Sequence, residues 1–114
     1  MTDPAFNIKQ GDRIPSLDVV CYSADGAVLN LTGATGVVFN MRHERGGALV
    51  VSAGAATIVS AVGGQLRYSW GASDTATVGT YYGEFVITWP GPLQQTVPTV
   101  GKVVITVTDA GVIG

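Results

Sequence analysis

Residues 64–89 read GQLRYSWGASDTATVGTYYGEFVITW, and this stretch decides the fold. Two segments in which large apolar residues alternate with smaller or polar ones, 65–70 and 80–89, flank a short polar loop. Alternation with a period of two is typical of β-strands, because successive side chains point to opposite faces of a sheet. The stretch predicts two strands joined by a loop, with at most one helical turn over 72–79.

Similar patterns recur along the whole chain. Further strands are predicted at 16–23, 28–31, 36–42, 48–52, 56–61 and 102–108, all rich in β-branched or aromatic residues. Turn signals separate them at Asp25-Gly26, Thr32-Gly33, Gly46-Gly47, Gly63-Gly64 and Pro90-Gly91-Pro92. Short strands joined in this way predict an all-β protein, either a sandwich or a small barrel.

The length of 114 residues fits one domain. We expect an N-terminal arm or edge segment at 1–13, a β-sandwich domain at 14–109 and a C-terminal tail at 110–114. The N-terminal segment either pairs with the sheet edge of a neighbouring chain or frays. Residues 90–98, PGPLQQTVP, contain too much proline for a central strand and predict an exposed loop or edge.

Strand alternation also sorts the side chains into faces. The large residues that share one face predict the core, and its principal members are Phe39, Tyr68, Trp70, Tyr81, Phe85 and Trp89. The opposite faces carry apolar side chains where charge is expected on a free surface. The residues predicted to form a protein interface are Val20, Tyr22, Val38, Val86, Val104 and, from the N-terminal segment, Phe6. Single valines also occur on surfaces that have no partner.

Composition supports contact with other chains and excludes several classes of protein. Only 12% of the residues are charged, whereas 46% are hydrophobic. No apolar run is long enough for a membrane-spanning helix, and the N-terminus does not resemble a secretory signal. The six basic residues are scattered singly, which argues against nucleic-acid binding. The single cysteine, Cys21, forms no disulfide framework and suits folding in a reducing cytosol.

Residues that could carry chemistry are few. The only histidine, His43, lies in a polar turn with no acid or cysteine at metal-ligand spacing. The carboxylates of Asp74 and Glu84 could form a catalytic pair only in a cleft, which a small sandwich seldom provides. The glycine pairs match no phosphate-binding motif. We therefore expect no catalytic residue, no metal site and no cofactor.

The order of several segments resembles a known family. FNIKQGDRIPSLDV is followed by ADGAVLNLTGATGVVFNMR, then by GGQLRYSWGASDTATVGTYYGEFVITWPG, and finally by Thr-Val-Pro before KVVITV. This series resembles the immunoglobulin-like N-terminal module of phage baseplate upper proteins and related small tail proteins of bacterial viruses. The resemblance runs from Phe6 to Val107 and depends on the series as a whole. It implies a single immunoglobulin-like antiparallel β-sandwich.

The resemblance also implies a structural role. Such modules dock fibres or other tail components through their sheets and carry no catalytic residues. The chain is then a virion protein, made in the cytoplasm of the bacterial host, that assembles in several copies as a homo-oligomer and contacts other virion proteins. In baseplate upper proteins a long further region follows the module, whereas this sequence ends at Gly114. A tail, baseplate or neck adaptor is expected, with a capsid decoration protein as the alternative.

A second alternative is a carbohydrate-binding or adhesion module. In that case the ring of Trp70, Tyr82 or Trp89 would stack on a sugar. Aromatic residues at strand spacing are more often part of a core.

Overall fold

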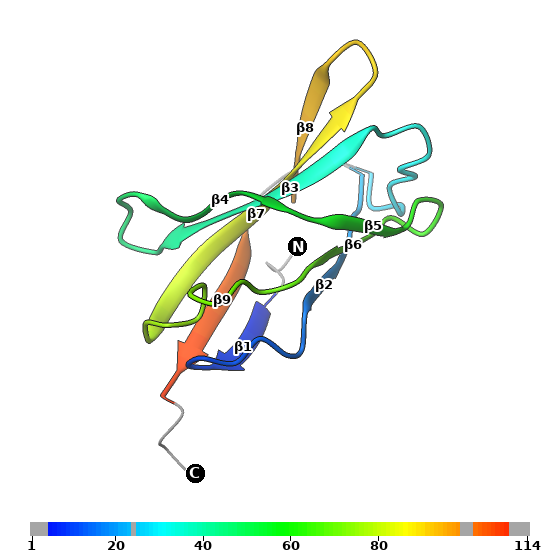
Figure 1. Ribbon diagram of the computed structural model, residues 1–114. Helices are drawn as coiled ribbons and strands as arrows, with labels where there is room; N and C mark the ends of the chain where they lie inside the picture. The colour runs from blue at the N-terminus through cyan, green and yellow to red at the C-terminus, as the bar shows by residue number, and fades with distance from the viewer. Residues whose placement is uncertain (1–4, 24, 99–101, 110–114) are drawn as a thin grey trace.

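The computed structural model describes residues 5–23, 25–98 and 102–109. In this part of the chain there are nine strands and no helix (Figure 1). The strands are β1 (Ala5–Lys9), β2 (Leu17–Val20), β3 (Gly36–His43), β4 (Leu49–Ala55), β5 (Thr57–Ser60), β6 (Gln65–Tyr68), β7 (Gly79–Trp89), β8 (Leu93–Val97) and β9 (Val103–Thr108). The predicted all-β fold is confirmed.

Six strands form the larger sheet. Their order is β1-β9-β7-β3-β4, and β8 also pairs with β7. One edge of β7 pairs with β3, and the other edge pairs first with β9 and then with β8. β8 and β9 therefore lie end to end along the same edge of β7. All pairs in this sheet are antiparallel except that of β1 with β9.

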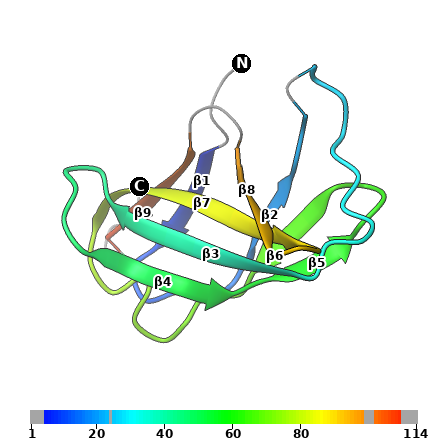
Figure 2. The ribbon, with the colours of Figure 1, turned by 90° about the horizontal axis from the view of Figure 1, so that it is seen from above.

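Three strands, in the order β2-β6-β5, form the smaller sheet. Figure 1 shows β4 of the larger sheet continuing into β5 of the smaller one, so that a single stretch of chain joins the two layers. Seen from above, β3, β4 and β7 lie side by side in the larger sheet (Figure 2). Leu66 of the smaller sheet and Phe85 and Ile105 of the larger sheet are fully buried. The core thus lies between two sheets, as in a sandwich.

The centre of the core is an aromatic cluster around Phe39. Its ring stacks on Tyr68 with centroids 4.6 Å apart, and it lies 4.9 Å from the ring of Phe85. The ring of Trp70 meets it edge-on at 6.1 Å. A Cβ atom added to Gly83 would be only 2.7 Å from Cζ of Phe39. The lack of a side chain at Gly83 therefore makes room for the central ring.

Of the six aromatic residues predicted to form the core, five are buried and Trp89 is half-buried. Trp89 is the last residue of β7, and its indole nitrogen donates a hydrogen bond to Oε1 of Gln95 on β8 (3.1 Å). The alternation that predicted Trp89 as core continues to the end of β7, where Trp89 packs against the core but is only partly buried. Trp89 thus marks the margin of the core.

The segment 28–31 does not form the predicted strand. Instead of a regular strand pair, the segment forms one isolated β-bridge, between Tyr22 and Val28. Asn30 accepts a hydrogen bond from the backbone N–H of Thr32 through its side chain (2.9 Å), and such local bonds compete with sheet pairing. Leu31 is nevertheless buried, so the segment contributes to the core as a loop.

The N-terminal segment forms an edge strand of the larger sheet. Residues 5–9 form β1, which pairs with β9 of the same chain instead of with a neighbour. The side chain of Phe6 is half-buried, and its ring lies 5.7 Å from that of Trp70. Phe6 therefore packs at the margin of the core, and its part in an interface stays a prediction. The predicted tail at 110–114 lies outside the described residues, as do residues 1–4.

Candidate interaction surfaces

The outer face of the larger sheet carries a row of side chains that no second layer covers in the described structure. The residues that form this face on β3, β7 and β9 are Val38, Asn40, Arg42, Thr80, Tyr82, Glu84, Val86, Thr88, Val104 and Thr106. Val38 lies directly opposite Val86, and Tyr82 lies opposite Val104. Most of these side chains are half-buried by their neighbours, and six of the ten are valine or threonine.

Charge on this outer face is sparse, and its acidic residue, Glu84, lies next to Val86 along β7. Glu84 is the only acidic residue in the set and lies opposite Asn40. Arg42 lies opposite Tyr82, and Nζ of Lys102 is 4.6 Å from the centre of the Tyr82 ring. The Val38–Val86 pair therefore forms a small apolar patch without an adjacent cation. Few charged groups would lose water when another protein covers it.

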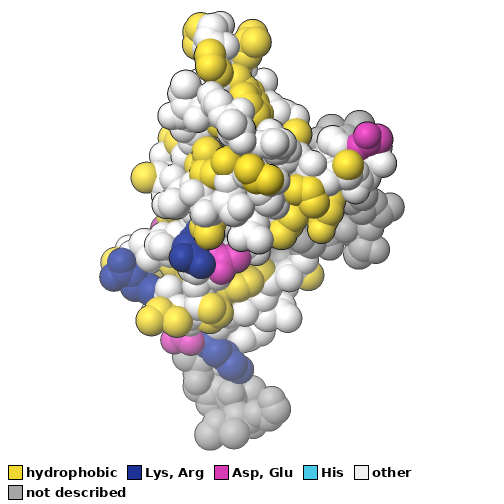
Figure 3. Space-filling model, turned by 90° about the vertical axis from the view of Figure 1, so that its right-hand side faces the viewer, with side chains coloured by type: hydrophobic (Ala, Val, Ile, Leu, Met, Phe, Trp, Pro, Cys, Tyr) yellow, Lys and Arg dark blue, Asp and Glu magenta, His cyan; other side chains and the backbone are white. Residues whose placement is uncertain are grey.

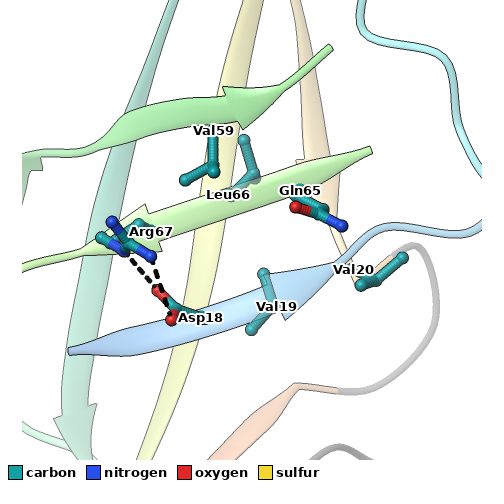
Figure 4. A pocket seen from close by; sticks show the side chains of 7 residues that line it. All are labelled: Asp18, Val19, Val20, Val59, Gln65, Leu66 and Arg67. Atoms are coloured by element: carbon teal, nitrogen blue, oxygen red, sulfur yellow. Dashed lines mark hydrogen bonds and ion pairs between the residues drawn. The ribbon is translucent and has the colours of Figure 1, made fainter. Parts of the chain in front are cut away.

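The outer face of the smaller sheet is a second candidate surface. Val20 and Tyr22 are 43% and 45% exposed there. Figure 3 shows that hydrophobic side chains are spread over this side of the molecule with few acidic or basic groups between them. Beside Val20 the surface is hollowed by a depression of about 260 Å³ (Figure 4). Its lining residues are Asp18, Val19, Val20, Val59, Gln65, Leu66 and Arg67.

The charged groups of this depression neutralise each other. Nε of Arg67 donates to Oδ1 of Asp18 at 2.7 Å, across the β2–β6 pair (Figure 4). The hydrogen bond and the charge of Asp18 raise the pKa of Arg67. Both side chains are about half exposed, so the pair adds little to stability. The depression offers a ligand apolar contacts and a polar rim whose charges are already paired.

The strand residues predicted to take part in a protein interface lie on more than one face. Val38, Val86 and Val104 lie on the outer face of the larger sheet, whereas Val20 and Tyr22 lie on the opposite side of the sandwich. A sequence pattern shows that a residue faces outward but not from which sheet. The valines of the larger sheet form one surface, and the other two residues belong to another.

The loop between β6 and β7 contributes to the fold through its polar residues. Oδ2 of Asp74 accepts hydrogen bonds from the backbone N–H of Gly71 (2.6 Å) and from the hydroxyl of Tyr68 (2.5 Å). Thr75 is fully buried and donates through Oγ1 to the carbonyl of Asp12 (2.8 Å). Asp74 therefore fixes the turn through a local backbone N–H, whereas the side chain of Thr75 links the N-terminal segment to the loop.

The residues considered for catalysis lie apart. Asp74 is bonded to Tyr68, which faces the core, whereas Glu84 is exposed on the outer face of the larger sheet. Nδ1 of His43 accepts a hydrogen bond from the backbone N–H of Arg45 (3.2 Å). The ring of His43 meets the ring of Tyr81 edge-on, with the centroids 5.4 Å apart. Among the residues that the structure describes, no group of three His, Cys, Asp or Glu could hold a metal ion.

Cys21 is unpaired and buried in the core. Burial raises the pKa of its thiol to about 11. A thiol with a raised pKa is a poor nucleophile at neutral pH, because the thiolate is the reactive form. Its environment is that of an inert core residue.

The aromatic residues of the sugar-binding alternative occupy three different places. Trp70 is only 1% exposed, and its indole N–H donates to the carbonyl of Pro15 (3.1 Å). Its ring therefore cannot stack on a sugar in the folded protein. Tyr82 lies on the outer face of the larger sheet, and Trp89 lies in the β7–β8 hairpin. They do not form one aromatic platform with Trp70.

Val59 and Leu49, which sequence reasoning missed, are 44% and 45% exposed, and Leu93, in the predicted exposed segment 90–98, is 65% exposed. Each lies in an edge strand. Leu93 carried a signal, because a leucine next to proline in a segment unsuited to a central strand indicates an exposed edge.

Fold and surfaces together define a β-sandwich domain with two sheet faces that no other described element covers. No protein-family model matches the sequence, and a search of curated proteins finds no similar chain. The described residues contain no helix with the length and hydrophobicity that a membrane crossing requires.

Proposed function

We propose that the chain is a non-enzymatic structural protein of a bacterial virus, an adaptor of the tail, baseplate or neck. It assembles in several copies and docks fibres or other virion proteins. The observation that carries this proposal is the outer face of the larger sheet. Val38, Val86 and Val104 lie there among hydroxyl groups, with one acidic residue.

The physical reason is the balance between the apolar contact and the cost of desolvation. Burying apolar surface contributes roughly 25 cal/mol per Å², and ordering and desolvation costs offset much of it. A face of half-buried valines and threonines therefore gives modest contacts that become stable when they repeat in a symmetric assembly. Such a surface suits structural docking better than the binding of a small molecule.

The assignment to a virus depends on the ordered resemblance from Phe6 to Val107 to modules of phage baseplate upper proteins. An all-β sandwich is the fold that this resemblance implies, and to that extent the fold supports the proposal. A capsid decoration protein would use the same outer face, and it differs from an adaptor in copy number and place. The burial of Trp70 argues against the sugar-binding alternative.

Quantitative peptide mass spectrometry of gradient-purified virus particles from the source tests the proposal. The chain is expected at a fixed ratio to the major capsid protein, at a handful to a few dozen copies per particle. Hundreds of copies would replace the adaptor by a capsid decoration protein. Absence of the chain from the particles would overturn the proposal.

A further inference from the structure

The edge strand β8 has an open side. Within the described residues it pairs only with β7, in a regular register from Phe85↔Val97 to Trp89↔Leu93. In an antiparallel pair, alternate residues of an edge strand direct their N–H and C=O groups away from the partner. The five residues of β8, LQQTV, include no charge. Figure 1 shows the β7–β8 hairpin extending away from the rest of the molecule.

The other edges carry features that oppose pairing with another chain. β1 has Lys9 and β2 has Asp18. The register of β4 shifts twice against β3, and Ala53 has a positive φ of 50°. The register of β5 shifts between Ile58 and Ser60. Charges and bulges are devices by which proteins protect sheet edges. Of the edges in the described structure, β8 alone is both regular and uncharged.

The order of proline, apolar and polar residues around β8 is the same in both directions from Gln95. Residues 92–98 read PLQQTVP, with proline at both ends. Leu93 and Val97 are the apolar residues at equal distance from the centre, and Gln94 and Thr96 are the polar ones. If two copies of this strand pair antiparallel about Gln95, every residue meets one of its own kind. Self-complementarity of this sort is what a two-fold interface requires.

We propose that β8 pairs antiparallel with β8 of a second copy of the chain, centred on Gln95, so that one sheet continues through a two-fold dimer. Leu93, which is 65% exposed, would then lie opposite Val97 of the second copy. Pro92 and Pro98 lack an N–H and limit the pairing to the five residues between them. This fixes the register.

The dimer is expected to be weak by itself. A five-residue strand buries much less than the roughly 800 Å² per partner of a standard stable interface. The proposal deepens the function proposed above, on which its biological role rests, by naming one contact of the assembly. The two can fail separately, because dimerisation is measured on the purified chain and the virion assignment on virus particles.

Sedimentation velocity of the full chain over a range of concentrations tests the pairing. We expect a reversible monomer–dimer equilibrium. The double variant Q94K/T96K places a lysine opposite a lysine at both polar pairs and should weaken the dimer about tenfold. The variant Q94K/T96E has charges at the same positions, but each meets its opposite, and dimerisation should be kept. Two lysines on another edge, T57K/V59K on β5, serve as the matched control and should not change it.

Cross-linking tests the register independently. Opposite residues in an antiparallel pair have Cα atoms about 4.5 to 5.5 Å apart, which suits a disulfide. A mixture of the Q94C and T96C variants should therefore form a mixed disulfide much faster than either variant forms one with itself. The proposal is overturned if the wild-type chain stays monomeric in sedimentation and the mixed disulfide forms no faster than the other disulfides. It is also overturned if a folded Q94K/T96K variant dimerises like the wild type. If Q94K/T96K fails to fold, the mixed disulfide decides alone.

Discussion

The hydroxyl of Tyr68 donates a hydrogen bond of 2.5 Å to Oδ2 of Asp74, the same oxygen that accepts the backbone N–H of Gly71. This carboxylate oxygen joins the end of β6 to the loop that leads into β7. Asp74 is thus held by the fold and directs its bonding oxygen toward Tyr68, a residue of the core. The polar loop within residues 64–89 therefore has a structural role, because its carboxylate holds the chain between β6 and β7.

Replacing Asp74 should therefore cost stability. The Asp74→Ala variant leaves two donors without their acceptor and should lose about 1 to 3 kcal/mol of unfolding free energy. Tyr68→Phe removes one bond and leaves the bond to Gly71, so its cost should be smaller, about 0.5 to 1.5 kcal/mol. Urea denaturation of both single variants and the double variant measures the coupling. Unchanged stability of Asp74→Ala would contradict a structural role for the loop.

Gly83 should not tolerate a side chain. In Gly83→Ala the added Cβ would meet Cζ of Phe39 at 2.7 Å and Cδ1 of Ile105 at 3.0 Å. Overpacking of this kind costs about 1 to 3 kcal/mol. Gly36→Ala is the matched control, because a Cβ there would have no atom within 4 Å. Equal denaturation midpoints for the two variants would show that the core yields more easily than the distances indicate.

The thiol of Cys21 should react slowly with a thiol reagent at pH 8 in the folded protein and rapidly in denaturant. Stability should also fall as the pH rises from about 9 to about 11. Well below pH 9.0, the ordinary pKa of a thiol, Cys21 is protonated in both states, and as the pH rises through this value the unfolded chain ionises first. Burial raises the pKa of Tyr68 and of Tyr81 as well, so both add to the loss at higher pH.

Denaturation midpoints of the wild type and Cys21→Ala between pH 8 and 10 check the contribution of the thiol. The decline should be shallower in the variant. A wild-type thiol that reacts as fast as a free cysteine at pH 8 would place Cys21 outside the core.

The valine pair on the outer face should matter for assembly more than for folding. Val38→Lys/Val86→Glu replaces one cross-strand apolar pair, which is worth about 0.2 to 1 kcal/mol, by a pair of opposite charges, and it places two charges where another protein would bind. Incorporation of the variant into particles should drop sharply, while its thermal melting changes little. Thr57→Lys, at an exposed position on β5, should be incorporated normally. Equal incorporation of the two would contradict a contact through this face.

Much of the fold could be predicted from local patterns. Alternation located the strands that became β3, β6, β7 and β9, and it sorted Phe39, Trp70 and Phe85 onto the inner faces because the period of two is a backbone property. The pattern failed at 28–31, where the side chain of Asn30 binds the backbone locally. It also missed β1, because the parallel partner β9 is nearly a hundred residues away in the sequence.

The candidate surfaces could be predicted only in part. Val38, Val86 and Val104 were recognised as outward-facing, but their nearness depends on the strand order β9-β7-β3. Val20 and Tyr22 showed the same pattern and lie on the opposite side of the sandwich. The open edge of β8 was visible as a proline-flanked segment, whereas the contrast with the other edges needed the register of every strand.

The most direct test of the central claim is covalent footprinting of side chains in the free chain and in purified virus particles. If the outer face of the larger sheet is the docking surface, Val38, Val86 and Val104 should be labelled in the free chain and protected in the particles. Labelling of exposed Val62, which is 72% exposed in the β5–β6 turn, serves as the internal reference. Equal labelling of the three valines in both states, relative to this reference, would contradict the account.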